Sequence, residues 1–361
     1  EAARTLGHGP VYVFWRVALP MARPAIVAGV SLVVMETLND YGAVKHFGVP
    51  TFTTGIFRTW LSLNDMPGAL RLAACLMVLV FFFLFLEKCL RFRAKFHVNK
   101  QAGHTLRRYS LGKVASFAAI VCCLLPLLAG FLVPVSRMSW WASLTFEKVL
   151  DSSFFGLLLN STGIAAIAGL ITMTIALFLA FSARYFNCRK LSFTNRLAIL
   201  GYSVPGAVIA MGVLLLAGHF RDFGGWVLTG SLVTLTFAYL VRFLAVAWQS
   251  IDSGMERNCD QLNDASKTLG ASPGVSLRMV NVPLLRNSML AAGLFVFVDT
   301  MKELPLTLIL RPFNFETLST RAFDLTSQAQ IPESSLPSLC IILVVLLPVI
   351  CLNRQMRVRP K

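Results

Sequence analysis

The sequence predicts an all-α protein that crosses a membrane about eight times. Of its 361 residues, 56% are hydrophobic and only 14% are charged, and the mean hydropathy is +0.69. Soluble domains carry about 25% charged residues. The apolar surplus is therefore larger than a protein core can bury, and it indicates lipid as the surrounding solvent. At about 20 residues per crossing, the chain has room for roughly eight to ten helices.

Apolar runs of the required length follow one another along the chain. Six of them are the segments 70–86, 114–135, 156–181, 197–218, 226–247 and 336–352. The other two are 24–35, which we extend toward Val44, and 288–298, which we extend toward Leu310. These two contain acidic residues near their ends, and such residues are costly inside a bilayer.

Lys and Arg are concentrated in every second connection between these runs. Together, these connections hold 24 of the 33 basic residues, and they are 1–24, 88–113, 184–196, 242–286 and 354–361. Positive loops stay on the cytoplasmic side of a membrane, so the net charge of +16 reflects topology. We expect lipid, and no nucleic acid, as the partner of this charge, because zinc-finger spacings and basic patches interleaved with aromatic residues are missing from the sequence.

A stretch at the start of the chain is repeated near its end. At an offset of 263, residues 1–60 align with residues 264–323 without a gap, and 14 of the 60 positions are identical. We predict a tandem duplication. Residues 1–100 are then the last part of a first half with its final two spans, 101–113 are a cytoplasmic linker, and 114–361 are a second half of six spans. Four further spans are expected before Glu1, in the same chain or in a separate one.

Each copy of the repeat opens on the same pattern of acidic, small and turn-forming residues. These residues are Glu1, Ala2, Ala3, Gly7 and Pro20 in the first copy, and Asp264, Ala265, Ser266, Gly270 and Pro283 in the second. An acid followed by helix-favouring small residues starts a short helix, and the glycine ends or bends it. We predict a cytoplasmic knob that docks on a partner protein. The alternative is an amphipathic connection without a partner.

The pattern resembles the EAA loop of binding-protein-dependent ABC importer permeases, which reads E-A-A, three residues, G, nine residues, I-x-L-P. The resemblance implies the transmembrane domain of a type I ABC importer in the bacterial inner membrane. It also implies two partners, a cytoplasmic ATPase dimer that docks on the loops and a periplasmic substrate-binding protein. The chain has no P-loop sequence, so ATP hydrolysis is expected of the ATPase. The chain itself is then no enzyme and needs no cofactor.

Three stretches, 40–56, 201–210 and 302–312, are similar to the two-half permeases of ferric iron importers. This similarity implies ferric iron as the transported substrate. Thiamine, polyamines, phosphonates and sugar phosphates stay open as alternatives, because permeases of this class carry them too. A carrier driven by protons or sodium and an integral membrane enzyme are the alternatives from other classes, and neither needs a duplicated docking loop.

Four acidic residues recur at matching positions near the outer ends of the repeated spans: Glu36, Asp40, Asp299 and Glu303. Within each copy they are four residues apart, which predicts one helical face that lines a translocation pathway or an outer gate. The alternative is a set of structural pins at the headgroup level, paired with Lys302 or a neighbouring Arg.

Pro205 and Gly206 interrupt the run 197–218. A broken membrane helix leaves backbone groups that must line a cavity or pack on protein, so we predict a bend in the pathway, with ordinary tolerance of a buried proline as the alternative. The five His residues neither cluster nor pair at i, i+4, and no metal site is predicted.

Overall fold

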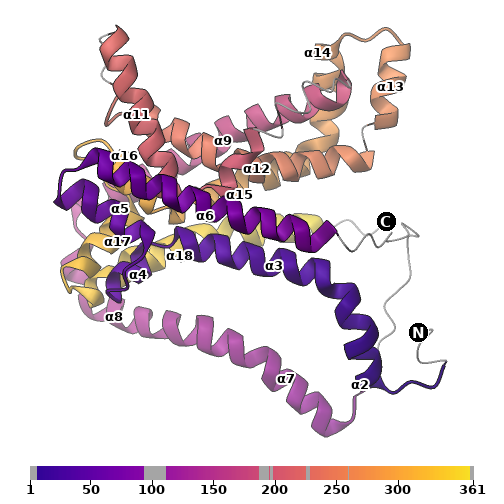
Figure 1. The fold of residues 1–361 in the computed structure, drawn as a ribbon, viewed down its shortest axis with the longest axis horizontal. Helices are drawn as coiled ribbons and strands as arrows, with labels where there is room; N and C mark the ends of the chain where they lie inside the picture. The colour runs from indigo at the N-terminus through magenta and orange to yellow at the C-terminus, as the bar shows by residue number, and fades with distance from the viewer. Residues whose placement is uncertain are drawn as a thin grey trace. The chain divides into compact units, whose positions relative to one another are not determined.

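The computed structural model describes residues 6–92, 111–186, 195, 198–224, 228–258 and 260–357. Within these ranges every regular element is a helix (Figure 1), which confirms the predicted fold class.

The helices fall into three stretches of the chain. The first contains α2 (Pro10–Val13), the π-helical η1 (Phe14–Ala18), α3 (Leu19–Asn39), α4 (Gly42–His46), α5 (Phe52–Phe57), the π-helical η2 (Arg58–Ser62) and α6 (Met66–Phe92). The second contains α7 (Lys113–Leu127), the π-helical η3 (Leu128–Leu132), α8 (Val133–Val149), α9 (Ser152–Tyr185), the 3-10 turn η4 (Ile199–Ser203), α11 (Gly206–Gly224) and α12 (Leu232–Asn258). The third contains α13 (Asp260–Thr268), α14 (Pro273–Val275), the π-helical η5 (Ser276–Asn281), α15 (Val282–Lys302), α16 (Pro305–Leu310), α17 (Leu318–Ser327) and α18 (Ile331–Arg357).

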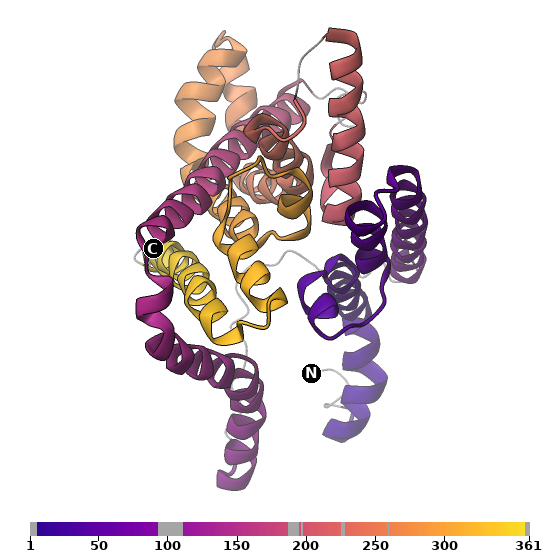
Figure 2. The ribbon, with the colours of Figure 1, turned by 90° about the vertical axis from the view of Figure 1, so that its left-hand side faces the viewer.

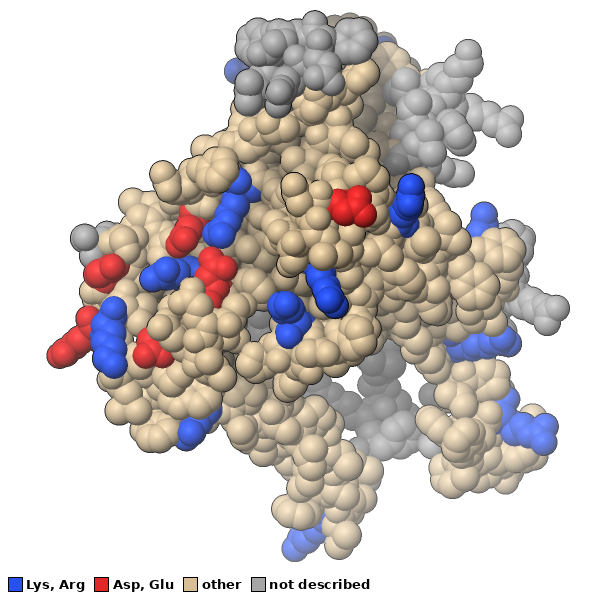
Figure 3. All heavy atoms as spheres, turned by 60° about the vertical axis from the view of Figure 1, so that its left-hand side comes forward, with Lys and Arg blue, Asp and Glu red and all other residues tan. Residues whose placement is uncertain are grey.

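Seven helical segments in the described ranges are long and apolar enough to cross a membrane. They are Pro10–Asn39, Met66–Leu90, Lys113–Val149, Ser153–Tyr185, Leu232–Glu256, Pro273–Lys302 and Ile331–Ile350. A shorter apolar helix, Gly206–His219, lies at the position of the remaining predicted crossing. Large apolar side chains are exposed along these helices, and most of the face in Figure 3 carries neither sign of charge, as lipid contact requires.

Three predicted spans have different ends in the structure. The helix expected to continue toward Val44 stops at Asn39, and the one expected to continue toward Leu310 stops at Lys302. The latter break lies at Glu303, whose backbone is extended with φ of −70° and ψ of 119°, and Pro305 follows as the first residue of α16. The run 197–218 is not one helix either, since η4 and α11 are separated at Val204 and Pro205.

One basic residue lies outside the loop to which the charge pattern assigned it. Arg242 belongs to α12, ten residues after its start, and is 6% exposed. It is therefore a buried charge within the candidate span Leu232–Glu256 and not part of an exposed loop. Among the other basic residues of that segment, Lys267, Arg278 and Arg286 lie on exposed positions.

The repeat is visible in the secondary structure as well as in the residues. The π-helical turns η1 and η5 lie at matching positions, and α3 and α15 begin and end at an offset of 263. Gly7 and Gly270 have the same left-handed backbone, with φ of +81° and +77°. Two copies of one backbone pattern thus occur with only 14 identities in 60 residues.

The register of the repeat changes after the short helices α4 and α16. Helix α5 begins at a capping box made by Thr51 and Thr54, and α17 begins at the same box made by Thr317 and Thr320. These boxes are 266 residues apart, so the second copy has three more residues before its box. The gapless alignment is wrong beyond this point, and the pairing of Arg58 with Arg321 does not hold.

The described chain divides into two compact units: Glu1–Leu38 with Cys75–Arg137, and Asn39–Ala74 with Met138–Lys361. In the first unit, the Ser31 hydroxyl on α3 donates to the Glu87 carboxylate on α6 at 2.9 Å. In the second, α9, α12 and α15 pack side by side (Figures 1 and 2). A Cβ atom on Gly169 of α9 would lie 2.9 Å from the Gly293 carbonyl oxygen of α15, so a small residue allows this close approach.

Candidate functional site

The second repeated loop, residues 264–283, is a short helix closed by a glycine turn. The Gly270 N–H donates to the Lys267 carbonyl and the Ala271 N–H to the Ser266 carbonyl, the pattern of a Schellman motif with Gly270 in its left-handed position. Asp264 and Ala265 are exposed on α13. Leu269, beside the turn, is 86% exposed, so the loop presents an apolar tip.

Ser266 points the other way. It is buried, and its hydroxyl oxygen lies 2.9 Å from that of Ser276 in η5. Of the three residues that open the second loop, two thus form its exposed face and one fixes the loop to the helix beneath it.

The first repeated loop, residues 1–20, has a matching tip. Leu6, the counterpart of Leu269, is 77% exposed and precedes the left-handed Gly7. Pro20 and Pro283 are exposed in the first turns of α3 and α15. Glu1, Ala2 and Ala3 lie outside the described residues.

The four repeated acids do not share the predicted helical faces. Asp40 and Glu303 lie just beyond the ends of α3 and α15, so a spacing of four residues no longer places them above Glu36 and Asp299. Glu36 is exposed on α3. Asp299 forms an ion pair with Lys302 at 3.2 Å, which is the contact expected of a structural pin.

Asp40 and Glu303 have the same local role in the two copies. The Asp40 carboxylate accepts the Ala43 N–H at 3.3 Å, and the Glu303 carboxylate accepts the Leu306 N–H at 3.2 Å. Each acid thereby satisfies a backbone donor at the start of a short helix, α4 or α16. Their carbonyl oxygens are also bound alike, by the hydroxyls of Thr53 and Ser319.

Only Glu303 is also part of a buried ion pair. Its Oε2 lies 3.4 Å from Arg242 Nη2, and both residues are at most 6% exposed. Arg242 Nη1 donates to Asn39 Oδ1 at 3.1 Å, and the Gly206 N–H donates to the same oxygen at 2.7 Å. Arg242 Nε has no acceptor among the described residues. We call Asn39, Gly206, Arg242 and Glu303 the central junction.

The central junction joins the two predicted halves. Asn39 ends α3 of the first half, whereas the other three residues belong to the second half and lie on α11, on α12 and after α15. An aromatic contact also crosses between the halves, since the Phe323 ring of the second half lies 5.3 Å from the Tyr41 ring of the first. Within the first half, Tyr41 stacks on Phe57 at 3.8 Å.

Gly206 is at a crowded position, where a larger residue would displace the side chains of the ion pair. A Cβ atom there would overlap Arg242 Nη1 and lie 2.7 Å from Glu303 Oε1. Pro205 is buried before it, where the helix is broken. The break in the helix at these two residues therefore brings the backbone at the start of α11 close to the ion pair.

We expect Gly206→Ala to lower the stability of the protein by about 1–3 kcal/mol, because the added methyl displaces the Arg242 guanidinium in a packed interior. Gly212→Ala in the same helix is the matched control. Its Cβ would meet no atom within 4 Å, and alanine favours a helix over glycine by about 0.5–1 kcal/mol. Thermal unfolding in detergent measures both, and equal midpoints would contradict the crowding at Gly206.

Arg242 and Asn39 are the residues that the sequence did not single out. Arg242 had a usable signal, since a charge inside the apolar run 226–247 is a functional candidate by default. Asn39 had none, because it lies 203 residues from Arg242 in the sequence, and its counterpart in the repeat is Lys302, which makes a different contact.

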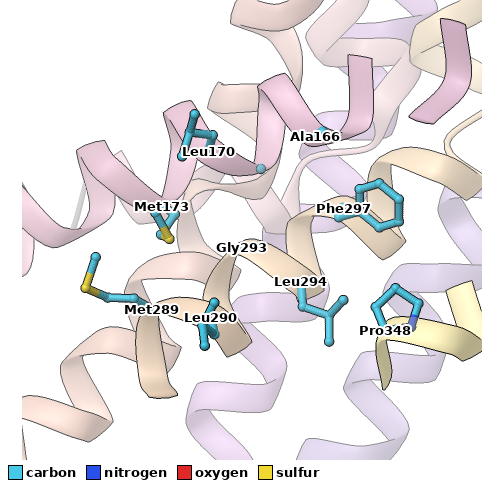
Figure 4. Close-up of a pocket in the computed structure, with 10 residues that line it drawn as sticks. Ala166, Leu170, Met173, Met289, Leu290, Gly293, Leu294, Phe297 and Pro348 are labelled. Carbon is cyan, nitrogen blue, oxygen red and sulfur yellow. The ribbon is translucent and has the colours of Figure 1, made fainter. Parts of the chain in front are cut away.

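A cavity of about 410 Å³ borders α9, α15 and α18 (Figure 4). Its walls are apolar, with Met173, Leu290, Phe297 and Pro348 among the lining residues. Such walls offer no ligands to an ion. In the described ranges, no group of three or more His, Cys, Asp or Glu residues is placed to hold a metal ion.

Comparison with known proteins places this arrangement among transport proteins. A family model described as the binding-protein-dependent transport system inner membrane component matches residues 1–95 and 172–358. The Fe(3+)-transport system permease protein FbpB 2 of Haemophilus influenzae is 29% identical over 98% of this chain and 70% of its own length. The putative 2-aminoethylphosphonate transport system permease protein PhnV of Salmonella typhimurium is 25% identical over 68% of this chain and 94% of its own.

Among solved structures, the fold is similar to a chain of a bacterial alginate ABC transporter crystallised with an alginate pentasaccharide-bound periplasmic protein. The TM-score is 0.54 at 10% identity, and the match covers 67% of this chain and 93% of that one. A likeness at this identity establishes the fold alone. The helices of this chain are therefore arranged like those of the matched transporter chain.

Proposed function

The chain belongs to the binding-protein-dependent transport system inner membrane component family, and we propose that it moves ferric iron into the cytoplasm. Family membership makes it a multi-pass inner-membrane protein and the permease subunit of an ABC importer. Iron as the substrate is supported by the relative from Haemophilus influenzae, which matches 98% of this chain, and by the stretches 40–56, 201–210 and 302–312. Ferric ion is a hard cation that prefers oxygen ligands.

We further propose that both repeated loops dock on a cytoplasmic ATPase, one subunit on each loop. The observation that carries this proposal is the matched tip, with Leu6 and Leu269 exposed beside Gly7 and Gly270. A left-handed glycine holds each apolar side chain outside its helix, where a partner groove can enclose it. ATP binding and hydrolysis then move the loops, and the π-helical turns carry this movement into α3 and α15.

The central junction is proposed as a gate between the two halves. Asn39 contacts Gly206 and Arg242 across the boundary, so a rocking of the halves that opens a path breaks these hydrogen bonds. Asp40 and Glu303 lie at the matched break of each span and hold the short helices in place. Glu36 and Asp299, which are outside the junction, are proposed to border the pathway less directly. Such a path binds its substrate weakly enough to release it.

We also propose a division of the chain into parts of two permease halves. Residues 1–100 supply the end of the first half, 101–113 link it to the second, and 114–361 form the second half. A periplasmic substrate-binding protein is proposed to deliver the substrate to the outer face.

Competition between substrates tests the proposed specificity. In cells that carry the complete importer, uptake of labelled ferric iron is expected to depend on this permease and to be unaffected by an excess of 2-aminoethylphosphonate, which the relative from Salmonella typhimurium is named for. Loss of iron uptake in the presence of the phosphonate, or iron uptake unchanged after deletion of the permease, would contradict it. A permease for another substrate would keep its ATPase loops and fail this test.

A further inference from the structure

A buried group of polar side chains fixes the second loop to the base of α15. Its members are Asn263 and Ser266 on α13, and Ser276 and Asn281 in η5, and each is at most 7% exposed. We call them the loop network. Asn281 Nδ2 donates to Asn263 Oδ1 at 2.8 Å and to the Ser276 carbonyl at 3.0 Å, while the Ser276 hydroxyl donates to Asn263 Oδ1 at 3.4 Å. Ser266 completes the network through its hydroxyl contact with Ser276 at 2.9 Å.

The loop network connects the docking tip with a membrane span in one step. Asn281 directly precedes Val282, the first residue of α15. The same helix ends at Lys302, next to Glu303 of the central junction. Helix α13 is therefore linked to the first turn of α15 by a chain of hydrogen-bonded side chains.

From Leu6 onward, the first loop repeats the left-handed glycine and the π-helical turn of the second loop without polar side chains at the positions of Ser276 and Asn281. At the positions that match Ser266, Ser276 and Asn281, the sequence has Ala3, Val13 and Ala18. The π-helical turn η1 still forms there, with Val13 half-buried and Ala18 exposed. The polar residues are thus not needed to make the turn, and their presence in the second copy calls for another cause.

Burial makes such a network costly unless its groups are bonded to one another. A buried amide or hydroxyl without a partner destabilises a protein, whereas a connected set in a low-dielectric interior fixes one geometry. Asn281 Oδ1 has no donor among the described residues, so the network is maintained at some cost to stability. The bonded side chains hold the loop in one geometry relative to α15.

We propose that the loop network makes the second loop a rigid transmitter of ATPase movement, while the first loop, with apolar residues at the same positions, is compliant. Residues of the network act as positioning residues and do not touch the ATPase. This inference rests on the proposed docking role of the loops, and it adds that the two loops are not equivalent. The second half is then the one in which ATP hydrolysis is tightly linked to span movement.

Conversion of the second loop to the residues of the first tests this inference. Asn281→Ala copies Ala18, and Ser266→Ala, which removes one hydroxyl, copies Ala3 and is the milder variant. In the assembled importer we expect each to lower substrate uptake per ATP hydrolysed, about fivefold for Asn281→Ala, which corresponds to about 1 kcal/mol of coupling. The amount of ATPase that copurifies should stay unchanged. Ser272→Ala is the matched control, because Ser272 is exposed in the same loop and its side chain makes no capping bond.

Two results would overturn the proposal. One is an unchanged ratio of uptake to ATP hydrolysis in both variants. The other is a fall in ATPase copurification that accounts for the whole loss of uptake, because the network would then merely shape the docking surface. Stimulation of ATP hydrolysis by the binding protein, measured beside uptake, keeps the test independent of the substrate. If the unaltered importer binds no ATPase, the proposed docking itself fails, and that result is recognised before any variant is compared.

Discussion

Gly270→Asp is expected to abolish ATP-driven uptake by the assembled importer while the permease still inserts and folds. At a φ of +77° a side chain costs about 1–2 kcal/mol, which is small beside the stability of a multi-helix protein. The aspartate also places a negative charge beside the exposed Leu269, on the tip proposed to enter an ATPase groove. Uptake per folded permease and copurification of the ATPase measure the effect.

Gly274→Asp is the control for this change. Gly274 lies four residues further along the same exposed loop, its φ is not in the left-handed region, and a Cβ there meets no atom within 4 Å. Gly7→Asp, with Gly9→Asp as its control, repeats the test in the first loop. Normal uptake in both Gly7→Asp and Gly270→Asp would contradict the docking role of the loops.

Removal of one partner of the buried ion pair is expected to have the largest effect on stability. Arg242→Leu leaves the Glu303 carboxylate buried and uncompensated, which costs about 3–5 kcal/mol. The double variant Arg242→Leu with Glu303→Leu should recover most of this loss, because two apolar side chains replace a pair whose desolvation is costly. Unfolding in detergent measures both. Equal midpoints of the single and double variants would show that the pair is not coupled.

Asn39→Ala separates the gate from a structural pin. It keeps the ion pair and removes the side-chain amide whose oxygen accepts from Gly206 and Arg242, a loss of about 1 kcal/mol per bond. A gate predicts a much larger change in uptake per folded molecule than this small loss of stability explains. Unchanged uptake per molecule would leave Asn39 as a structural contact alone.

Regular features of the molecule follow from local sequence, and this is why they could be predicted. Long apolar runs form helices in a bilayer, because lipid offers no partner to free backbone groups, and the repeated glycines and prolines specify the same turns in both copies. The ends of α3 and α15 were missed for the opposite reason. They depend on Asp40 and Glu303 accepting backbone N–H groups of the next helix, and an apolar run gives no sign of such caps.

Contacts between distant segments explain the other differences between the predictions from the sequence and the structure. The charge pattern assigned Arg242 to a loop. Its contacts with Glu303 and Asn39 form only when distant helices pack together, so the sequence gives no sign of them. The loop network could not be predicted from the EAA pattern either, because Asn263, Ser276 and Asn281 are not part of that pattern. The three additional residues before the Thr317 box shift the register after α16, and a gapless alignment cannot detect them.

ATP-driven uptake of ferric iron into proteoliposomes tests the central claim most directly. The complete permease, reconstituted with its ATPase and with the binding protein on the opposite side, is expected to accumulate labelled iron only when ATP is supplied on the ATPase side. A proton or sodium gradient should have no effect. Iron accumulation that follows either gradient without ATP would instead indicate an ion-coupled carrier, and it would contradict the assignment of the two loops to an ATPase.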